Sequence, residues 1–340
     1  MNGRSIYSED PETTQWEMLM QYSYESNVKK ELSKRKFSGP ENLSETVAGA
    51  FSQAYEYFRA SNASSLYTSP LLLYYGMANL LSGACQIMAG TFLDVNVHGM
   101  FLQPAGSQSL EHLADVTVCP IANGKGALSV FGQMLDPEWD FSRLGHWTLG
   151  ELLGRMPDLY DEYCEFYGST SPSLIPLERN TDGRVFIDRV KQESLDRYPQ
   201  LAPFLVTVPH FSNAYLDPQD VTMVEHAIVL HQKPGGPDIT LQGMSGSLFL
   251  CTGHGSAHVD HVPTQDILLY MTFFALGFLS RYRPDLWNPF VKTDSTGERH
   301  VFAKCVDVAR RVFPNLVLNR LLGYSVDFSS RREEPNKIGS

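Results

Sequence analysis

The segment from Leu71 to about Met88 is apolar on almost every side. Ser69-Pro70 precedes it, and a proline at the first helical position loses no hydrogen bond, because that N–H has no partner within a helix. A helix without a polar face needs neighbours all round. The segment therefore predicts a central bundle helix. Gly76 inside it indicates close contact with another helix, since glycine is otherwise unfavourable in a helix interior.

Two other parts of the chain have helical patterns that can supply those neighbours. Upstream, apolar residues recur three to four positions apart as far as Phe58. Downstream, Pro263 predicts the start of a helix that runs to about Tyr282, and two more helices are expected over 299–313 and 314–322. The first and last thirds of the chain are therefore predicted to be helical.

The middle of the chain is richer in β-branched residues. Val116–Pro120 and Leu128–Met134 are short β-like runs, and the turn-forming residues 123–126 between them predict a hairpin. Further candidate strands lie between Arg184 and Leu250. The order of helices, mixed β and helices again is typical of an α+β protein, here predominantly helical.

We expect four parts along the chain. Residues 1–112 form an N-terminal helical bundle, residues 113–262 form a mixed α/β region, and residues 263–328 form C-terminal helices that pack back on the core. Residues 329–340 are polar and predict a flexible tail.

The charge of the chain restricts its partners. The 340 residues carry a formal net charge of −11, so the molecule as a whole repels nucleic-acid phosphate and only a local basic patch could attract it. Residues 281–340 form a basic part, with 11 Lys and Arg against 7 Asp and Glu. Five cysteines without close pairs fit a reducing compartment. The sequence shows no apolar leader and no apolar run near the ~20 residues of a membrane span, which predicts a cytoplasmic protein without a membrane partner.

The segment Arg281–Trp287 follows the predicted C-terminal apolar helix and combines two arginines with aromatic rings. Guanidinium groups bind anions through paired hydrogen bonds, and aromatic rings stack with bases or with guanidinium groups. We therefore expect Arg281 and Arg283 to contact an anion, with Tyr282 and Trp287 as the stacking surface. The alternative is that the arginines only satisfy carbonyls at a helix end.

Two more candidate ligand-binding residues are associated with the N-terminal bundle. Tyr75 follows Tyr74 in the predicted central helix, where core packing is the simpler interpretation and ligand contact the alternative. His98 lies beyond that helix and is expected near the end of the bundle.

A histidine-rich segment follows the last candidate strand. Cys251, His254, His258 and His261 have the spacing of one helix face, and thiolate with imidazole is a zinc-binding set. Two glycines within the segment and the helix start at Pro263 favour a loop instead. The segment therefore predicts a zinc site, a functional loop without metal, or a structural turn, and no cofactor other than zinc is implied.

The motifs of several common enzymes are absent from the sequence. Residues 243–247 resemble a hydrolase nucleophile elbow, but Ser247 stands where that motif requires glycine. The chain has no phosphate-cradling glycine loop, no dinucleotide-binding fingerprint and no Cys-x-x-Cys pair.

Five pieces of the sequence resemble the YaaC-like family of bacterial proteins, and they occur in the order found in that family. They are Ser69–Leu81, the His98-Gly99 pair, Leu149–Tyr167, Leu279–Trp287 and Pro314–Gly323. The Tyr-Tyr-Gly and Arg-Tyr-x-Pro-x-x-Trp pieces are the most specific, and the resemblance spans roughly residues 15–325.

The N-terminal helices also resemble the HEPN superfamily of small helical bundles, over about residues 40–102. Many HEPN proteins are RNases that use an Arg followed four to six residues later by His. His98 has no Arg at that distance upstream, which favours a non-catalytic bundle. The resemblance implies a homodimer.

These observations lead to three hypotheses of function. The first is a cytoplasmic, non-catalytic interaction or ligand-sensing protein that binds an anion, such as a nucleotide or nucleic-acid phosphate. Its partners would be RNA or a nucleotide, a protein, and a second copy of the chain. The second is an enzyme, either a HEPN-type RNase or a metal-assisted hydrolase that uses the segment 251–261. The third is a structural scaffold.

Overall fold

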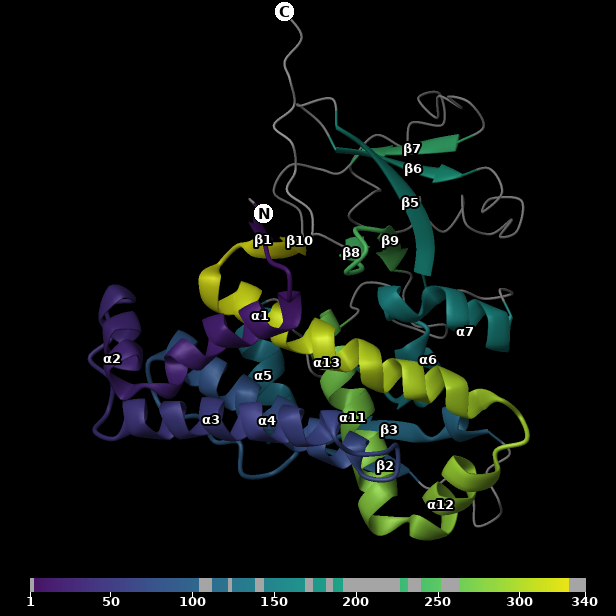
Figure 1. Ribbon diagram of the computed structural model, residues 1–340, viewed down its shortest axis with the longest axis horizontal. Helices are drawn as coiled ribbons and strands as arrows, with labels where there is room; N and C mark the ends of the chain where they lie inside the picture. The colour runs from purple at the N-terminus through teal and green to yellow at the C-terminus, as the bar shows by residue number, and fades with distance from the viewer. Residues whose placement is uncertain are drawn as a thin grey trace, which may run out of the picture.

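Helix α4 (Ser69–Ala89) is the helix predicted to be central, and it packs against the helices before and after it in the chain. The computed structural model describes residues 3–103, 112–121, 124–137, 144–168, 174–181, 186–191, 227–231, 240–251 and 263–329 (Figure 1). Within these residues the fold is α+β and predominantly helical, as predicted. One continuous hydrophobic core extends from Trp16 to Leu321 and takes side chains from all three large parts of the chain. The boundaries between those parts stay a prediction.

The N-terminal helices pack on α4 chiefly through the last of them. They are α1 (Pro11–Met20), the short 3-10 helix η1 (Gln21–Ser23), α2 (Glu25–Lys34) and α3 (Leu43–Asn62). Helix α3 crosses α4 closely at Gly76, where a Cβ atom would lie 2.7 Å from Cδ2 of Phe58. The close helix contact expected at Gly76 is therefore present.

Helix α4 is also long and apolar enough to span a membrane by length and composition, the one such helix in the part of the chain that the structure describes. Most of its surface is buried inside the protein, so it packs as a core helix.

The C-terminal helices pack on α4 through the first and the last of them. They are α11 (Gln265–Tyr282), α12 (Pro284–Thr293) and α13 (Glu298–Leu322). The prediction of two helices separated at Pro314 is wrong, because α13 continues through this proline. Proline removes one helical hydrogen bond, but Phe313 and Val317 on either side are buried in the core and hold the helix in place.

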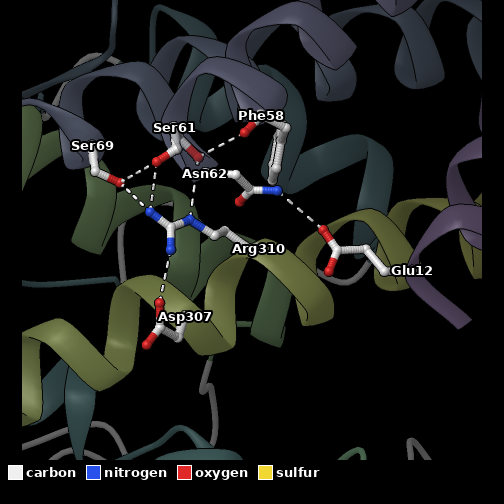
Figure 2. Close-up of polar contacts among 7 residues, drawn as sticks. All are labelled: Glu12, Phe58, Ser61, Asn62, Ser69, Asp307 and Arg310. Carbon is white, nitrogen blue, oxygen red and sulfur yellow. Dashed lines mark hydrogen bonds and ion pairs between the residues drawn. The ribbon is translucent and has the colours of Figure 1, made fainter. Parts of the chain in front are cut away.

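Arg310 of α13 joins the end of α3 to the start of α4 (Figure 2). Its Nη2 atom donates to the carbonyl of Ser61 at 2.7 Å and to the hydroxyl of Ser69 at 2.7 Å, and Asp307 accepts from Nη1 at 2.8 Å. The guanidinium satisfies a carbonyl at a helix C-terminus, where a positive charge is favourable. We therefore regard this cluster as structural.

A small antiparallel sheet follows α4, with strand order β2-β3-β4. Its strands are β2 (Met100–Gln103), β3 (Thr117–Pro120) and β4 (Trp147–Thr148), and the 3-10 helix η2 (Leu113–Asp115) precedes β3. The predicted hairpin with a second strand at 128–134 is wrong, because these residues form helix α5 (Ala127–Leu135). Leu128, Phe131 and Leu135 are buried with a helical spacing that a short apolar run does not distinguish from a strand.

The described strands between Leu174 and Cys251 form a second sheet, with order β7-β6-β5-β9-β8 and antiparallel neighbours. They are β5 (Leu174–Thr181), β6 (Phe186–Lys191), β7 (Ala227–His231), β8 (Thr240–Gln242) and β9 (Leu248–Cys251). The turn after β8 contacts η4 (Pro157–Leu159), which lies between α6 (Leu149–Leu153) and α7 (Tyr160–Tyr167), since Met244 N donates to Asp158 Oδ1 at 3.0 Å.

The two ends of the described chain lie side by side (Figure 1). Strand β1 (Gly3–Tyr7) pairs in parallel with β10 (Ser325–Ser329), in the register Gly3 to Ser325. The expected tail at 329–340 lies outside the described residues except for Ser329.

Candidate functional site

Arg281 and Tyr75 meet where the last turn of α11 passes α4. Nη1 of Arg281 donates a hydrogen bond of 2.5 Å to the phenol oxygen of Tyr75. Arg281 is exposed and Tyr75 is half-buried, so the contact lies at the protein surface. It joins two of the residues that the sequence singled out separately.

His98 is brought to the same place by the segment that follows α4. Nδ1 of His98 lies 2.5 Å from the phenol oxygen of Tyr74. The neighbouring charge of Arg281 also acts on this imidazole. We call the four residues Tyr74, Tyr75, His98 and Arg281 the Arg281 site.

Two glycines fix the backbone that carries His98. Amides at the start of α5 donate to this segment, Ala127 N to Val97 O at 2.8 Å and Leu128 N to His98 O at 3.1 Å. Gly126 has φ +100°, and a Cβ there would lie 2.7 Å from the backbone of Gly99. Glycine is therefore required for the two segments to come this close.

A hydrogen-bonded chain leads from the Arg281 site into the core. The phenol oxygens of Tyr74 and Tyr270 are 3.4 Å apart, and Tyr270 of α11 is fully buried. Burial raises the pKa of Tyr270 to about 12 and also raises the pKa of Tyr74, so both phenols are neutral near pH 7. Tyr270 has no distinguishing signal in the sequence, because it lies in an unbroken apolar run.

Aromatic rings surround the exposed side of the site. Tyr57 stacks on Tyr75 with ring centroids 5.7 Å apart. Tyr282 is 56% exposed, and the centre of its ring lies 5.0 Å from Cζ of Arg281. The centres of the Tyr282 and Phe278 rings are also 5.0 Å apart. An exposed guanidinium next to several rings can bind an anion and a flat group together.

Arg283 and Trp287 make contacts other than those of the Arg281 site. Arg283 donates to Asp285 through Nε at 3.0 Å and Nη2 at 2.7 Å, and hydrogen bonding to this carboxylate raises the pKa of Arg283. Trp287 is fully buried and donates from Nε1 to the Tyr67 carbonyl at 3.1 Å. The expectation that Trp287 offers stacking surface therefore needs correction, because its ring is covered by the core.

The charge of Arg281 is not balanced by a carboxylate among the residues that the structure describes. Other arginines pair with acids, for example Arg310 with Asp307 and Arg320 with Asp266. Arg281 instead contacts a neutral phenol and a tyrosine ring. The site therefore keeps a positive charge that can attract an anion.

The predicted zinc ligands cannot be assembled from the described residues. Cys251 is the last residue of strand β9, paired with Leu174, while His254, His258 and His261 lie outside the residues whose structure is described. Within the described ranges no group of three His, Cys, Asp or Glu could hold a metal ion. Zinc binding by the segment 251–261 stays a prediction.

The pKa of His98 predicts part of the acid sensitivity of the fold. Burial, and to a smaller extent Arg281, lower this pKa below the ordinary value of 6.5. As the pH falls through about 6.5 the unfolded chain therefore takes up the proton first, and stability decreases until the folded pKa is passed. The free energy of unfolding, measured with urea, should therefore decrease more between pH 7.5 and pH 5 in the wild type than in His98→Gln.

The control is the same comparison at pH 8 and pH 9, where His98 is neutral in both the folded and the unfolded chain. The difference in free energy of unfolding between the wild type and His98→Gln should be the same at these two pH values. An equal acid loss in both proteins would contradict the shift.

The fold and the site together define the class of the protein. It is a predominantly helical α+β protein with a histidine, several tyrosines and an arginine at one surface site, and this arginine has no carboxylate partner among the described residues. The model of the family described as YaaC-like protein matches residues 6–321, and the chain belongs to this family.

The matched range includes every residue of the Arg281 site. Comparison with curated proteins finds no match, and comparison with solved structures finds none either. The likeness to HEPN bundles has no support in these comparisons and stays a prediction.

Proposed function

We propose that the protein is a non-catalytic binding or sensing protein whose ligand is an anion held at the Arg281 site. The observation that carries the proposal is the contact between Arg281 and Tyr75. Through this contact the Tyr75 side chain holds the exposed guanidinium in a fixed position. The guanidinium has no carboxylate partner among the described residues. A fixed, unbalanced guanidinium gains strong charge-assisted hydrogen bonds when an oxyanion binds.

The rings around the guanidinium favour an anion that carries a flat group, such as a nucleotide or an RNA phosphate with its base. Tyr282 is exposed and Tyr57 is partly exposed. Aromatic rings such as these can stack with any of the nucleic-acid bases. The proposal keeps the setting expected from the sequence, which is a cytoplasmic homodimer that can also have a protein partner.

Arg281→Gln is expected to weaken binding of adenosine 5′-monophosphate by about 10-fold or more, because charge-assisted hydrogen bonds contribute roughly 1.5–3 kcal/mol. Titration calorimetry on the full chain measures the affinity. Arg283→Gln is the matched control, since Arg283 is held by Asp285, and its effect should stay below about 3-fold. Equal weakening in both variants, or no binding by the wild type, would overturn the proposal.

Native mass spectrometry of the untagged protein as purified tests the same proposal without a chosen probe. A dimer that carries a nucleotide-sized or oligonucleotide mass supports it. A metal-only adduct would favour the hydrolase hypothesis and the segment 251–261. A clean mass without adduct would favour the scaffold hypothesis. Cleavage of total RNA that disappears in His98→Gln would favour the RNase hypothesis.

A further inference from the structure

The orientation of the hydrogen bonds between Tyr270, Tyr74 and His98 decides which nitrogen of His98 carries the proton. The phenols have one proton each, and a neutral imidazole has one proton for two nitrogens. The fold places these three groups in one row that runs from the core to the surface. The row can be oriented in two directions.

The inner end of the row fixes the direction. Tyr270 is fully buried between apolar neighbours, and its ring lies edge-on to Phe131. Among the described residues its phenol has a single hydrogen-bond partner, the oxygen of Tyr74. A buried hydroxyl without an acceptor is unfavourable, so the Tyr270 proton is donated to Tyr74.

The proton of Tyr74 then points outward. The Tyr74 oxygen already accepts from Tyr270, so its own O–H is directed to Nδ1 of His98 at 2.5 Å. The reverse orientation would have His98 donate to Tyr74 and Tyr74 donate to Tyr270, which would leave the proton of Tyr270 without an acceptor in the core.

We propose that Tyr270 and Tyr74 hold His98 as the tautomer with its proton on Nε2, so that His98 presents a neutral N–H donor next to Arg281. Tyr74 and Tyr270 are positioning residues that act on a ligand only through His98. The neutral form is consistent with the lowered pKa of His98.

The inference rests on the proposed function, because the tautomer of His98 determines which anion the Arg281 site accepts. The guanidinium of Arg281 can only donate, and Tyr75 accepts from Arg281 and therefore directs its own proton away from it. With Nε2–H of His98, the side chains of Arg281 and His98 both offer only donors to a ligand. The ligand group that fits is a fully ionised oxyanion, such as a phosphate or carboxylate without a proton of its own.

The same tautomer also bears on the RNase hypothesis. A general base must have a free nitrogen lone pair to take the proton of a ribose hydroxyl. Nδ1 is occupied by Tyr74 and Nε2 already carries a proton, so His98 is set to bind a phosphate rather than to activate a nucleophile.

The test is a long-range proton–nitrogen correlation spectrum of the full chain with ¹⁵N-labelled histidine at pH 7.5. His98→Asn identifies the His98 signals by their absence. The expected result is a pyridine-type Nδ1 and a pyrrole-type Nε2 for His98. A pyrrole-type Nδ1 in the wild type would overturn the inference without any variant having to fold.

Two substitutions separate the relay from general effects on folding. Tyr74→Phe removes the donor to Nδ1, so His98 should become a mixture of both tautomers. Tyr75→Phe is the matched control in the same helix turn, since Tyr75 contacts Arg281 and not His98, and it should leave the His98 tautomer unchanged. An unchanged spectrum in Tyr74→Phe would contradict the relay.

Binding of adenosine 5′-monophosphate distinguishes the two proposals. Tyr74→Phe should weaken binding by ~3-fold or more while Arg281 remains in place, since a correctly directed neutral hydrogen bond contributes roughly 1 kcal/mol. If the wild type binds no nucleotide or phosphate but shows the Nε2–H tautomer, the proposed function is wrong and the relay is confirmed.

Discussion

Arg320→Met is expected to destabilise the protein by about 3 kcal/mol or more, because removing one partner of a buried ion pair leaves an uncompensated charge. Asp266 is 1% exposed, and Nε of Arg320 donates to its Oδ2 at 3.0 Å. Without Arg320 the carboxylate keeps only the hydroxyl of Thr264 and the amide of Ile267 as donors among the described residues. Urea unfolding followed by circular dichroism measures the loss.

Arg311→Met is the matched control on the same helix, because Arg311 is exposed, and a surface substitution of this kind should stay within about 0.5 kcal/mol. The double variant Asp266→Asn/Arg320→Met should recover part of the loss, since no charge is then left in the core. A loss below about 1 kcal/mol in Arg320→Met would show that the pair is not important for stability.

Gly126→Ala is expected to destabilise the protein by roughly 3–4 kcal/mol and to disturb the Arg281 site at the same time. Gly126 has φ +100° and ψ 177°, a conformation that is almost restricted to glycine. The added methyl group would lie 2.7 Å from Cα of Gly99 and 2.8 Å from the carbonyl of Val97. These are backbone atoms of the segment that carries His98, and they cannot rotate away.

Gly145→Ala is the control that separates conformation from crowding. Gly145 also has a positive φ, +66°, but a Cβ there would meet no atom within 4 Å. Its replacement should therefore cost only about 1 kcal/mol. The same urea experiment compares the two variants, and adenosine 5′-monophosphate binding should weaken in Gly126→Ala alone. Equal losses in both would contradict the close packing of the two segments.

The sequence predicted the elements that have a strong local pattern. The apolar runs of α4 and α11 give both helices with nearly correct ends, because burial on all sides leaves a continuous signal. The pattern failed at residues 127–135, where eight of the nine residues are apolar or small and fit a strand or a helix equally well. It also gave no indication of the β1–β10 pair, because pairing between distant strands has no local signature.

The site was predictable residue by residue but not as an arrangement. Arg281, Tyr75 and His98 each have a chemistry that draws attention in the sequence, and the crossing of α4 and α11 brings them together. Tyr74 and Tyr270 look like core residues, and only their contact with His98 and with each other indicates a role. Trp287 shows the opposite error, since proximity in sequence to Arg281 does not decide which way a ring faces.

The pairing of β1 with β10 has a consequence for synthesis on the ribosome. Of the described elements, strand β1 is translated first and its partner at 325–329 is translated last. At roughly 5–20 residues per second, β1 waits on the order of 15–60 s for β10. During that interval its edge is open to other nascent strands or to a chaperone. This short sheet can therefore close only after all the other described elements have been translated, so its strand pairing is the last contact among them for which both partners become available.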